Sequence, residues 1–288
     1  MKKTVITIII AVLCAFTSNA DASMVVMDYQ GLTVVHPNGI ERNLLINSDD
    51  GIGYDVALRP LDNGVKNGDG SVVIPLEYLY INNTKEDIYF RYNEYSNLLF
   101  GADMNGVAKS LIAKIKGYGM VPAGIYTINF EIQAREHETQ NIASMSTFML
   151  EFVVPPTQEI SFHGEEAAIN VSTKDVFERN KKIATENHPM VTINSNTDWA
   201  LFINTDKFGD AAGNYYIRTV AASPKVYERL QERIQLYPNK EILVAKGKAP
   251  SNNEYVSIEL AVEGKNGKIL KAGTYDNNLR FILREDRR

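Results

Sequence analysis

The chain has a single cysteine, Cys14, and it lies in a short N-terminal segment that is expected to be removed. The rest of the protein therefore has no thiol for a disulfide, a zinc–thiolate site, an iron–sulfur cluster or a cysteine nucleophile. A protein exported without disulfides must be stabilised by its hydrophobic core. The 266 residues after residue 22 are enough to build one or two such cores.

The N-terminal segment itself, residues 1–22, matches a secretory signal peptide. Lys2 and Lys3 form a positive start, Thr4–Phe16 is an apolar core of thirteen residues, and Ala20–Ala22 offers a small-residue cleavage site. A spanning helix needs about 20 apolar residues, so cleavage is expected, and an uncleaved anchor is the alternative. The segment predicts an exported protein, located in the periplasm, at the cell surface or outside the cell, with no membrane span after cleavage.

Positive charge is also scarce. Lys2, Lys3 and Asp21 belong to the signal peptide. The remaining chain has 28 basic and 34 acidic residues, which gives a net charge of −6. Mild acidity keeps a protein soluble and disfavours a phosphate-binding surface. Nucleic acid is therefore not an expected partner.

Catalytic and metal-binding motifs are absent from the sequence. The four histidines stand far apart: His36, His137, His163 and His188. No His-Glu-x-x-His spacing occurs, and no Gly-x-Ser-x-Gly elbow surrounds a serine. The oxygen-rich loops 62–70 and 103–106 lack the terminal glutamate of a calcium loop, and hairpin turns explain them better. The sequence predicts no catalytic, cofactor or metal site, and a protein that is not an enzyme.

Short alternating runs separated by turns fill most of the chain. Residues 52–58 and 88–92 alternate apolar with small or polar side chains, which is typical of half-buried strands. The segment Ser223–Ile234 differs. It has a serine cap, a proline in the first turn and apolar residues at 226, 230 and 234, which favours a short helix. A strand with charged edges is the alternative.

One phrase occurs twice. Pro122–Ile132 returns as Lys271–Leu283, and each copy begins with Ala-Gly, where glycine can take a positive φ in a tight turn. An alternating run follows in both copies, with Tyr126 and Phe130 on one face of the first. Each phrase therefore predicts a strand.

Two further blocks repeat in the same order. Ile46–Ile52 returns as Ile193–Trp199, and Leu111–Gly117 returns as Ile258–Gly264, both at a separation of 147 residues. Consecutive prolines at 155 and 156 provide a semi-rigid linker between the copies. The sequence predicts an all-β protein of two tandem immunoglobulin-like β-sandwich domains, residues 23–155 and 158–288, related by internal duplication.

The second phrase, together with Asn-Ser-Asn-Thr-Asp-Trp-Ala-Leu at 194–201, resembles bacterial secreted pilin-like proteins. These include spore coat protein U-type domains, fimbrial subunits of the chaperone–usher class and WxL-type surface domains. In those families the phrase forms a late strand of an immunoglobulin-like sandwich. The matching residues are Ala272, Gly273, Tyr275, Leu279 and Phe281. The absence of cysteine after the signal is a departure, because many fimbrial subunits carry a disulfide.

The resemblance implies an exported, non-enzymatic structural or adhesive protein of the bacterial surface, a subunit or tip component of a pilus-like fibre. A periplasmic pilus-assembly chaperone is one alternative, and a carbohydrate-binding module is the other. Five tyrosines within eighteen residues suggest a contact with surface glycans or with protein, or simply strand composition: Tyr78, Tyr80, Tyr89, Tyr92 and Tyr95. The one tryptophan, Trp199, is expected in the core rather than in a ligand site.

The two copies differ after the repeated phrase. The first is followed by an apolar strand, Thr147–Val154, whereas the second continues only to Arg288. We therefore expect the second sandwich to lack its final strand and to expose an apolar edge. The residues of that edge are Tyr275, Leu279, Phe281 and Leu283. Such an edge accepts a β-strand from another protein subunit. The alternative is that residues 160–171 fold back over it.

Overall fold

The computed structural model describes residues 25–28, 33–36, 39–48, 54–83, 85–99, 109–163, 169–172, 181–205, 213–264, 270–275 and 279–286. Within these ranges the regular structure is β, apart from one 3₁₀ turn, η1 (Leu76–Tyr78), and the strands pair antiparallel. The all-β prediction is thus confirmed. No helix in the described part of the chain could span a membrane. The predicted signal peptide, residues 1–22, lies outside the described residues.

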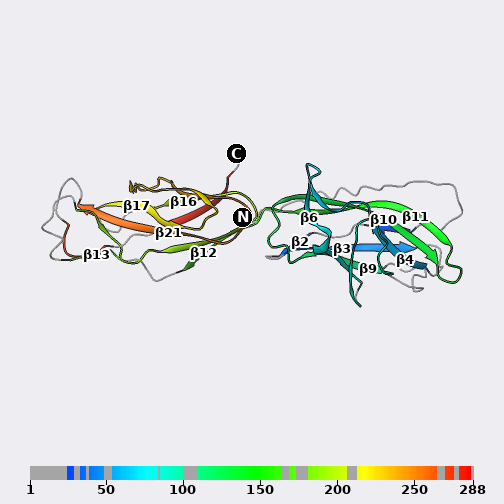
Figure 1. The fold of residues 1–288 in the computed structure, drawn as a ribbon. Coiled ribbons are helices and arrows are strands. Elements are labelled where there is room, and N and C mark those ends of the chain that lie inside the picture. The colour runs from blue at the N-terminus through cyan, green and yellow to red at the C-terminus, as the bar shows by residue number, and fades with distance from the viewer. Residues whose placement is uncertain are drawn as a thin grey trace. The chain divides into compact units, whose positions relative to one another are not determined.

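The chain forms two compact units. Unit 1 comprises Met1–Gly119 and Gly124–Val154, and unit 2 comprises Met120–Ala123 and Pro155–Arg288. Each unit contains two main antiparallel sheets, which can be followed in Figure 1. The predicted sandwich limits at 155 and 158 stay a prediction.

In unit 1 the first sheet has the order β1 (Val25–Asp28), β3 (Gly39–Ser48), β9 (Lys109–Lys116), β7 (Leu79–Asn82) and β8 (Asp87–Tyr89), with β2 (Val34–His36) also on β3. The second has the order β11 (Ile142–Val154), β10 (Gly124–Glu136), β5 (Gly64–Asn67) and β6 (Val72–Pro75), with β4 (Tyr54–Pro60) also on β10. Tyr126, Ile128 and Phe130 of β10 are buried, while Thr127 and Asn129 are half-buried on the other face. The alternation of apolar and polar residues in the sequence therefore corresponds to the buried and less buried faces of β10.

In unit 2 the first sheet has the order β12 (Gln158–His163), β15 (Met190–Ser195), β21 (Ser251–Gly264), β17 (Gly213–Ala222) and β19 (Ile234–Gln235), with β14 (Ile183–Ala184) also on β21. The second has the order β18 (Val226–Arg229), β20 (Ile242–Gly247), β16 (Trp199–Asn204) and β23 (Arg280–Glu285). A separate pair joins β13 (Ile169–Val171) to β22 (Gly273–Tyr275).

Trp199 is the centre of the unit 2 core. Its side chain is fully buried, and its indole Nε1 donates a 2.7 Å hydrogen bond to Ser251 Oγ. Gly247 lies against the ring so closely that a Cβ there would stand 2.3 Å from it. The predicted core role of Trp199 is confirmed, and a buried indole N–H with a partner is what such a core requires.

The helix predicted for Ser223–Ile234 is wrong. After a turn in which the Val226 N–H donates to the Ser223 carbonyl, the chain forms β18 and pairs with β20. Of the three apolar positions, Val226 and Leu230 pack against the core, whereas Ile234 is 43% exposed. A spacing of four residues is compatible with period 3.6 and, being even, also with period 2, so the core contact did not distinguish helix from strand.

The repeated blocks occupy matching places in the two units. The neighbours β1–β3–β9–β7 of unit 1 correspond in order to β12–β15–β21–β17 of unit 2. Likewise β10 pairs with β4, and β23 pairs with β16. These parallels favour duplication, which stays a prediction.

Candidate functional site

The last two strands of unit 1 are hydrogen-bonded neighbours in one sheet. β10 pairs with β11 from Gly124 to Arg135, and Figure 1 shows the two strands side by side. Phe130 of β10 is 0% exposed, and its ring stacks on Phe148 of β11 at a centroid distance of 5.5 Å. Because β11 continues the sheet, the core-facing side chains of β10 are shielded from water.

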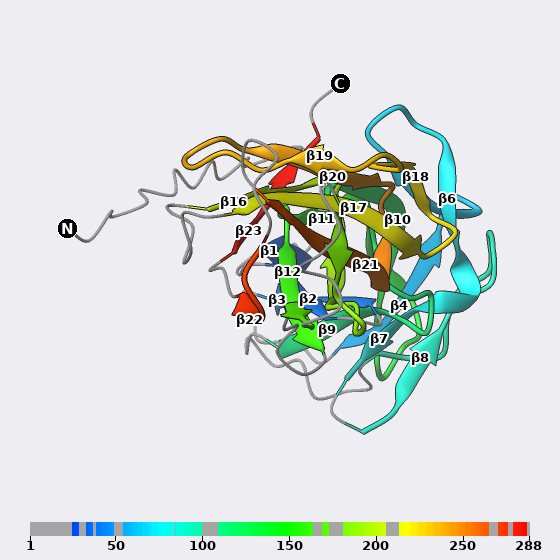
Figure 2. The same cartoon turned by 90° about the vertical axis from the view of Figure 1, so that its left-hand side faces the viewer.

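The matching strand of unit 2 is at the end of its sheet. β23 pairs with β16, beside which it lies in Figure 2, and no other strand of the described residues pairs with it. β12 ends the other sheet of the unit in the same way. In unit 2, β23 and β12 thus each lie at one edge of a sheet, whereas in unit 1 β11 lies beside β10.

The backbone of β23 can be oriented from one hydrogen bond. The Asp286 N–H donates to the Asp198 carbonyl at 2.8 Å, in register with the β16–β23 ladder. Backbone groups of an antiparallel pair point alternately toward and away from the partner strand. The N–H groups of Ile282 and Arg284 therefore face β16, and those of Phe281 and Leu283 face the open edge.

The same reasoning orients β12. The Asn196 N–H donates to the Thr157 carbonyl at 3.1 Å, in register with the β12–β15 ladder. The N–H groups of Ile160 and Phe162 consequently face away from β15. Among the described residues no strand pairs with the outward-facing N–H and C=O groups of either edge, the arrangement that invites another strand.

The side chains along these edges face the core without being fully covered by it. Leu279, Phe281 and Leu283 are half-buried and pack against the core of unit 2. Phe162 is opposite the fully buried Val191 and so shares its face, yet it is 61% exposed. Its ring meets Phe281 edge-on at 5.1 Å. A core-facing phenylalanine with this exposure marks the place where the sandwich is uncovered.

The structure brings together three of the four predicted edge residues. Leu279 precedes β23, and Phe281 and Leu283 belong to it, whereas Tyr275 is in β22, paired with Ile169 of β13. Of the segment 160–171, then, Ile169–Val171 covers β22, while β12 joins the opposite sheet. Sequence reasoning did not identify Phe162 as an edge residue, although its alternation with Ile160 was visible.

A buried ion cluster holds the other end of the β12 sheet. Glu259 on β21 is 6% exposed and accepts hydrogen bonds from Arg218 Nη2 at 2.7 Å and Arg233 Nε at 2.7 Å. Burial acts to raise the pKa of Glu259, and the hydrogen bonds and charges of the two arginines outweigh it, so this pKa lies below its ordinary value. The cluster links β21, β17 and the segment before β19, so it stabilises unit 2 through strands other than β12 and β23.

The predicted tyrosine group makes several separate ring contacts. Tyr80 contacts Tyr89 at 5.3 Å, Tyr78 contacts Tyr118 at 5.4 Å, and the Arg59 guanidinium lies over the Tyr95 ring. A contact of these tyrosines with glycans or protein stays a prediction.

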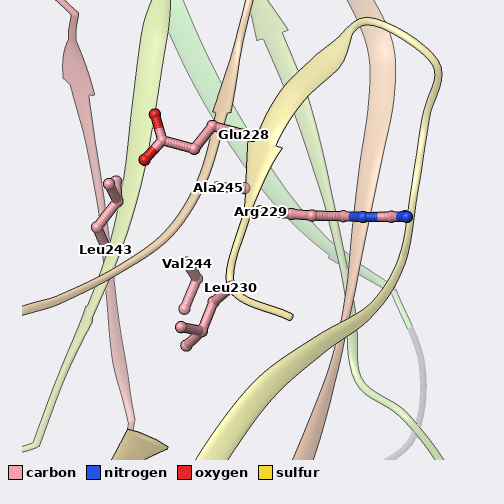
Figure 3. A pocket seen from close by; sticks show the side chains of 6 residues that line it. All are labelled: Glu228, Arg229, Leu230, Leu243, Val244 and Ala245. Carbon is pink, nitrogen blue, oxygen red and sulfur yellow. The ribbon is translucent and has the colours of Figure 1, made fainter. Parts of the chain in front are cut away.

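A small hollow in unit 2 is shown in Figure 3. It measures about 110 Å³ and is lined by Glu228, Arg229, Leu230, Leu243, Val244 and Ala245. Sites for small ligands and cofactors occupy about 300–1,000 Å³, so this one holds little more than water. Among the described residues no group of three or more His, Cys, Asp or Glu side chains could hold a metal ion.

No protein-family model matches the chain, and no curated protein matches it. Among solved structures it is similar to the CupB6 tip adhesin from Pseudomonas aeruginosa, with 10% identity over 91% of this chain and 94% of that one and a TM-score of 0.38. A chaperone–tip adhesin complex of CFA/I fimbriae gives 10% identity, 92% and 90% coverage and a TM-score of 0.34. The C-terminal domain of the Streptococcus agalactiae polypeptide BspA has 10% identity over 90% of this chain and 93% of that one, with a TM-score of 0.23. Similarity at this level assigns no function.

Proposed function

We propose that the protein is an exported structural or adhesive component of the bacterial surface, a subunit or tip component of a pilus-like fibre. Unit 2 accepts a β-strand from a partner subunit along the free edge of β23. The observation that carries this function is the 61% exposure of core-facing Phe162 opposite half-buried Phe281.

An added strand removes two costs at once. It pairs with the N–H groups of Phe281 and Leu283, which face the open edge of β23. It also takes apolar surface of Phe281 and Leu283 out of water. Full burial of one such side chain is worth about 1.5–3 kcal/mol, so these two partly buried side chains contribute a few kcal/mol. Because strand side chains alternate, the incoming segment needs apolar residues at every second position.

A synthetic peptide with the sequence of β11, residues 142–154, tests this function, because β11 is the strand that covers the matching edge of unit 1. With the full chain after residue 22, we expect the peptide to raise the melting temperature of unit 2. At a concentration 100 times Kd the stabilisation is about 2.7 kcal/mol.

Two controls accompany the measurement. A peptide with Leu150→Asp and Phe152→Asp loses the apolar alternation and should give no shift. The Phe281→Ala protein should bind the β11 peptide more weakly, whereas Tyr237→Ala, which lies after β19, should bind it as the wild type does. Equal shifts with both peptides, or none with either, would contradict strand acceptance.

A further inference from the structure

We propose that Phe162 is a latch that closes the acceptor edge of unit 2 while no partner strand is bound. This inference rests on the proposed function. Phe162 is on β12, at the end of one sheet, and its ring covers Phe281 on β23, at the end of the other. An incoming strand must displace the Phe162 ring before its own side chain can reach Phe281.

Unit 1 gives the comparison. There Phe130 meets two rings: Phe148 of the neighbouring strand β11 at 5.5 Å and 15°, and Phe90, which follows β8 of the other sheet, at 5.1 Å and 60°. In unit 2 Phe162 meets Phe281 from the opposite sheet at 5.1 Å and 67°, much as Phe90 meets Phe130. Phe90 is buried, whereas Phe162 is 61% exposed, so the ring of unit 2 is the one that can move away.

The contact between Phe162 and Phe281 is weak. Phe130 is fully buried, but Phe162 keeps 61% of its surface exposed, so little apolar area is lost when it moves away. The geometry of an aromatic pair contributes a factor of about 2 to 12 to an equilibrium or a rate. The latch therefore slows strand entry without preventing it.

The latch also selects the incoming strand. A large apolar side chain at the level of Phe281 gains the contact that Phe162 gives up. A glycine or a charged residue at that level leaves Phe281 uncovered and lets the ring return. Unit 2 consequently discriminates between strands at the level of Phe281, where the Phe162 ring competes with the incoming side chain.

Three forms of the full chain after residue 22 test the proposal: wild type, Phe162→Ala and Tyr237→Ala. Tyr237 is the matched control, because it is an aromatic residue of unit 2 that is 48% exposed and lies beyond β19, away from β12 and β23. The high exposure of Phe162 means that its removal should leave the fold intact, which a circular-dichroism melt checks.

The first readout needs no peptide. The Phe281 ring protons should carry a ring-current shift from the Phe162 ring 5.1 Å away, which Phe162→Ala should remove and Tyr237→Ala should leave unchanged in NMR spectra. An unchanged Phe281 ring shift in Phe162→Ala overturns the latch.

The second readout is the uptake rate of the β11 peptide. Phe162→Ala should take it up about 2- to 12-fold faster than the wild type and Phe162→Trp more slowly, with Tyr237→Ala unchanged. Equal uptake rates, or slower uptake by Phe162→Ala, would show that Phe162 is acceptor lining and would overturn the latch alone. Absence of uptake in every form overturns the proposed function together with the latch.

Discussion

Unit 1 and unit 2 share the order of their first strands and differ at the last one. In unit 1, β10 has β4 on one side and β11 on the other, and its Phe130 is 0% exposed. In unit 2, β23 has β16 on one side, and Phe281 and Leu283 stay half-buried. The same kind of strand is therefore sealed in one unit and accessible in the other. The difference is that β23 ends its sheet among the described residues whereas β10 does not, and strand acceptance at β23 stays a proposal.

The largest expected effect comes from a core substitution in unit 2, which should destabilise that unit without destabilising unit 1. Replacing Trp199 by Ala removes the largest buried side chain of unit 2 and the hydrogen bond that its indole N–H donates to Ser251. We expect unit 2 to lose about 5 kcal/mol, near the upper end for such truncations, and unit 1 to keep its transition. Urea unfolding followed by probes in each unit measures both. A single shared transition that moves as a whole would contradict independent units.

The next effect compares the loss of stability when a phenylalanine is removed from β10 and from β23. Phe130→Ala in β10 should cost unit 1 about 3–4 kcal/mol, because its ring is fully buried. Phe281→Ala in β23 should cost unit 2 about half as much, because water already reaches part of the ring. Chemical denaturation of the two variants gives the ratio. Equal losses would mean that β23 is as well covered as β10.

Much of the fold follows from the sequence, because it is local. Alternation predicted the strand character of β10, and the large apolar side chain of Trp199 between alternating neighbours predicted its burial. The helix at 223–234 was wrong because the four-residue spacing of Val226 and Leu230 fits both periods. The partner of β12 could not be predicted, since pairing of distant strands depends on tertiary packing. The exposure of Phe162 depends on that pairing as well.

A smaller effect concerns acid stability of unit 2 away from its edge. Glu259→Gln should cost about 1–2 kcal/mol at pH 7, because Arg218 and Arg233 lose a charged acceptor while part of each guanidinium stays in water.

The pH dependence follows from the lowered pKa of Glu259. This carboxylate stabilises the fold above its ordinary pKa of 4.5, and the contribution is lost as the pH falls through the lower folded value. Unfolding curves between pH 7 and pH 3 should therefore show wild type and Glu259→Gln converging at the acid end. A gap that stays constant, or that widens with acid, would contradict the ion cluster.

The smallest effect is expected at Phe162. Since its ring is 61% exposed, Phe162→Ala should change the stability of unit 2 by less than about 1 kcal/mol. Phe152→Ala in β11, where the ring is 0% exposed, should cost several times more. Comparable losses in thermal or urea melts would show that Phe162 is a core residue and that the β12 edge is closed.

The most direct measurement of the open edge is residue-resolved amide exchange in the free protein. The amides of Ile282 and Arg284 face β16, and those of Phe281 and Leu283 face the edge. We expect an alternating profile along β23, with Phe281 and Leu283 exchanging at least about tenfold faster than their neighbours, while β10 is protected at successive residues by β4 and β11. Uniform protection from Phe281 to Arg284 would mean that the edge of unit 2 is already paired, and would contradict strand acceptance.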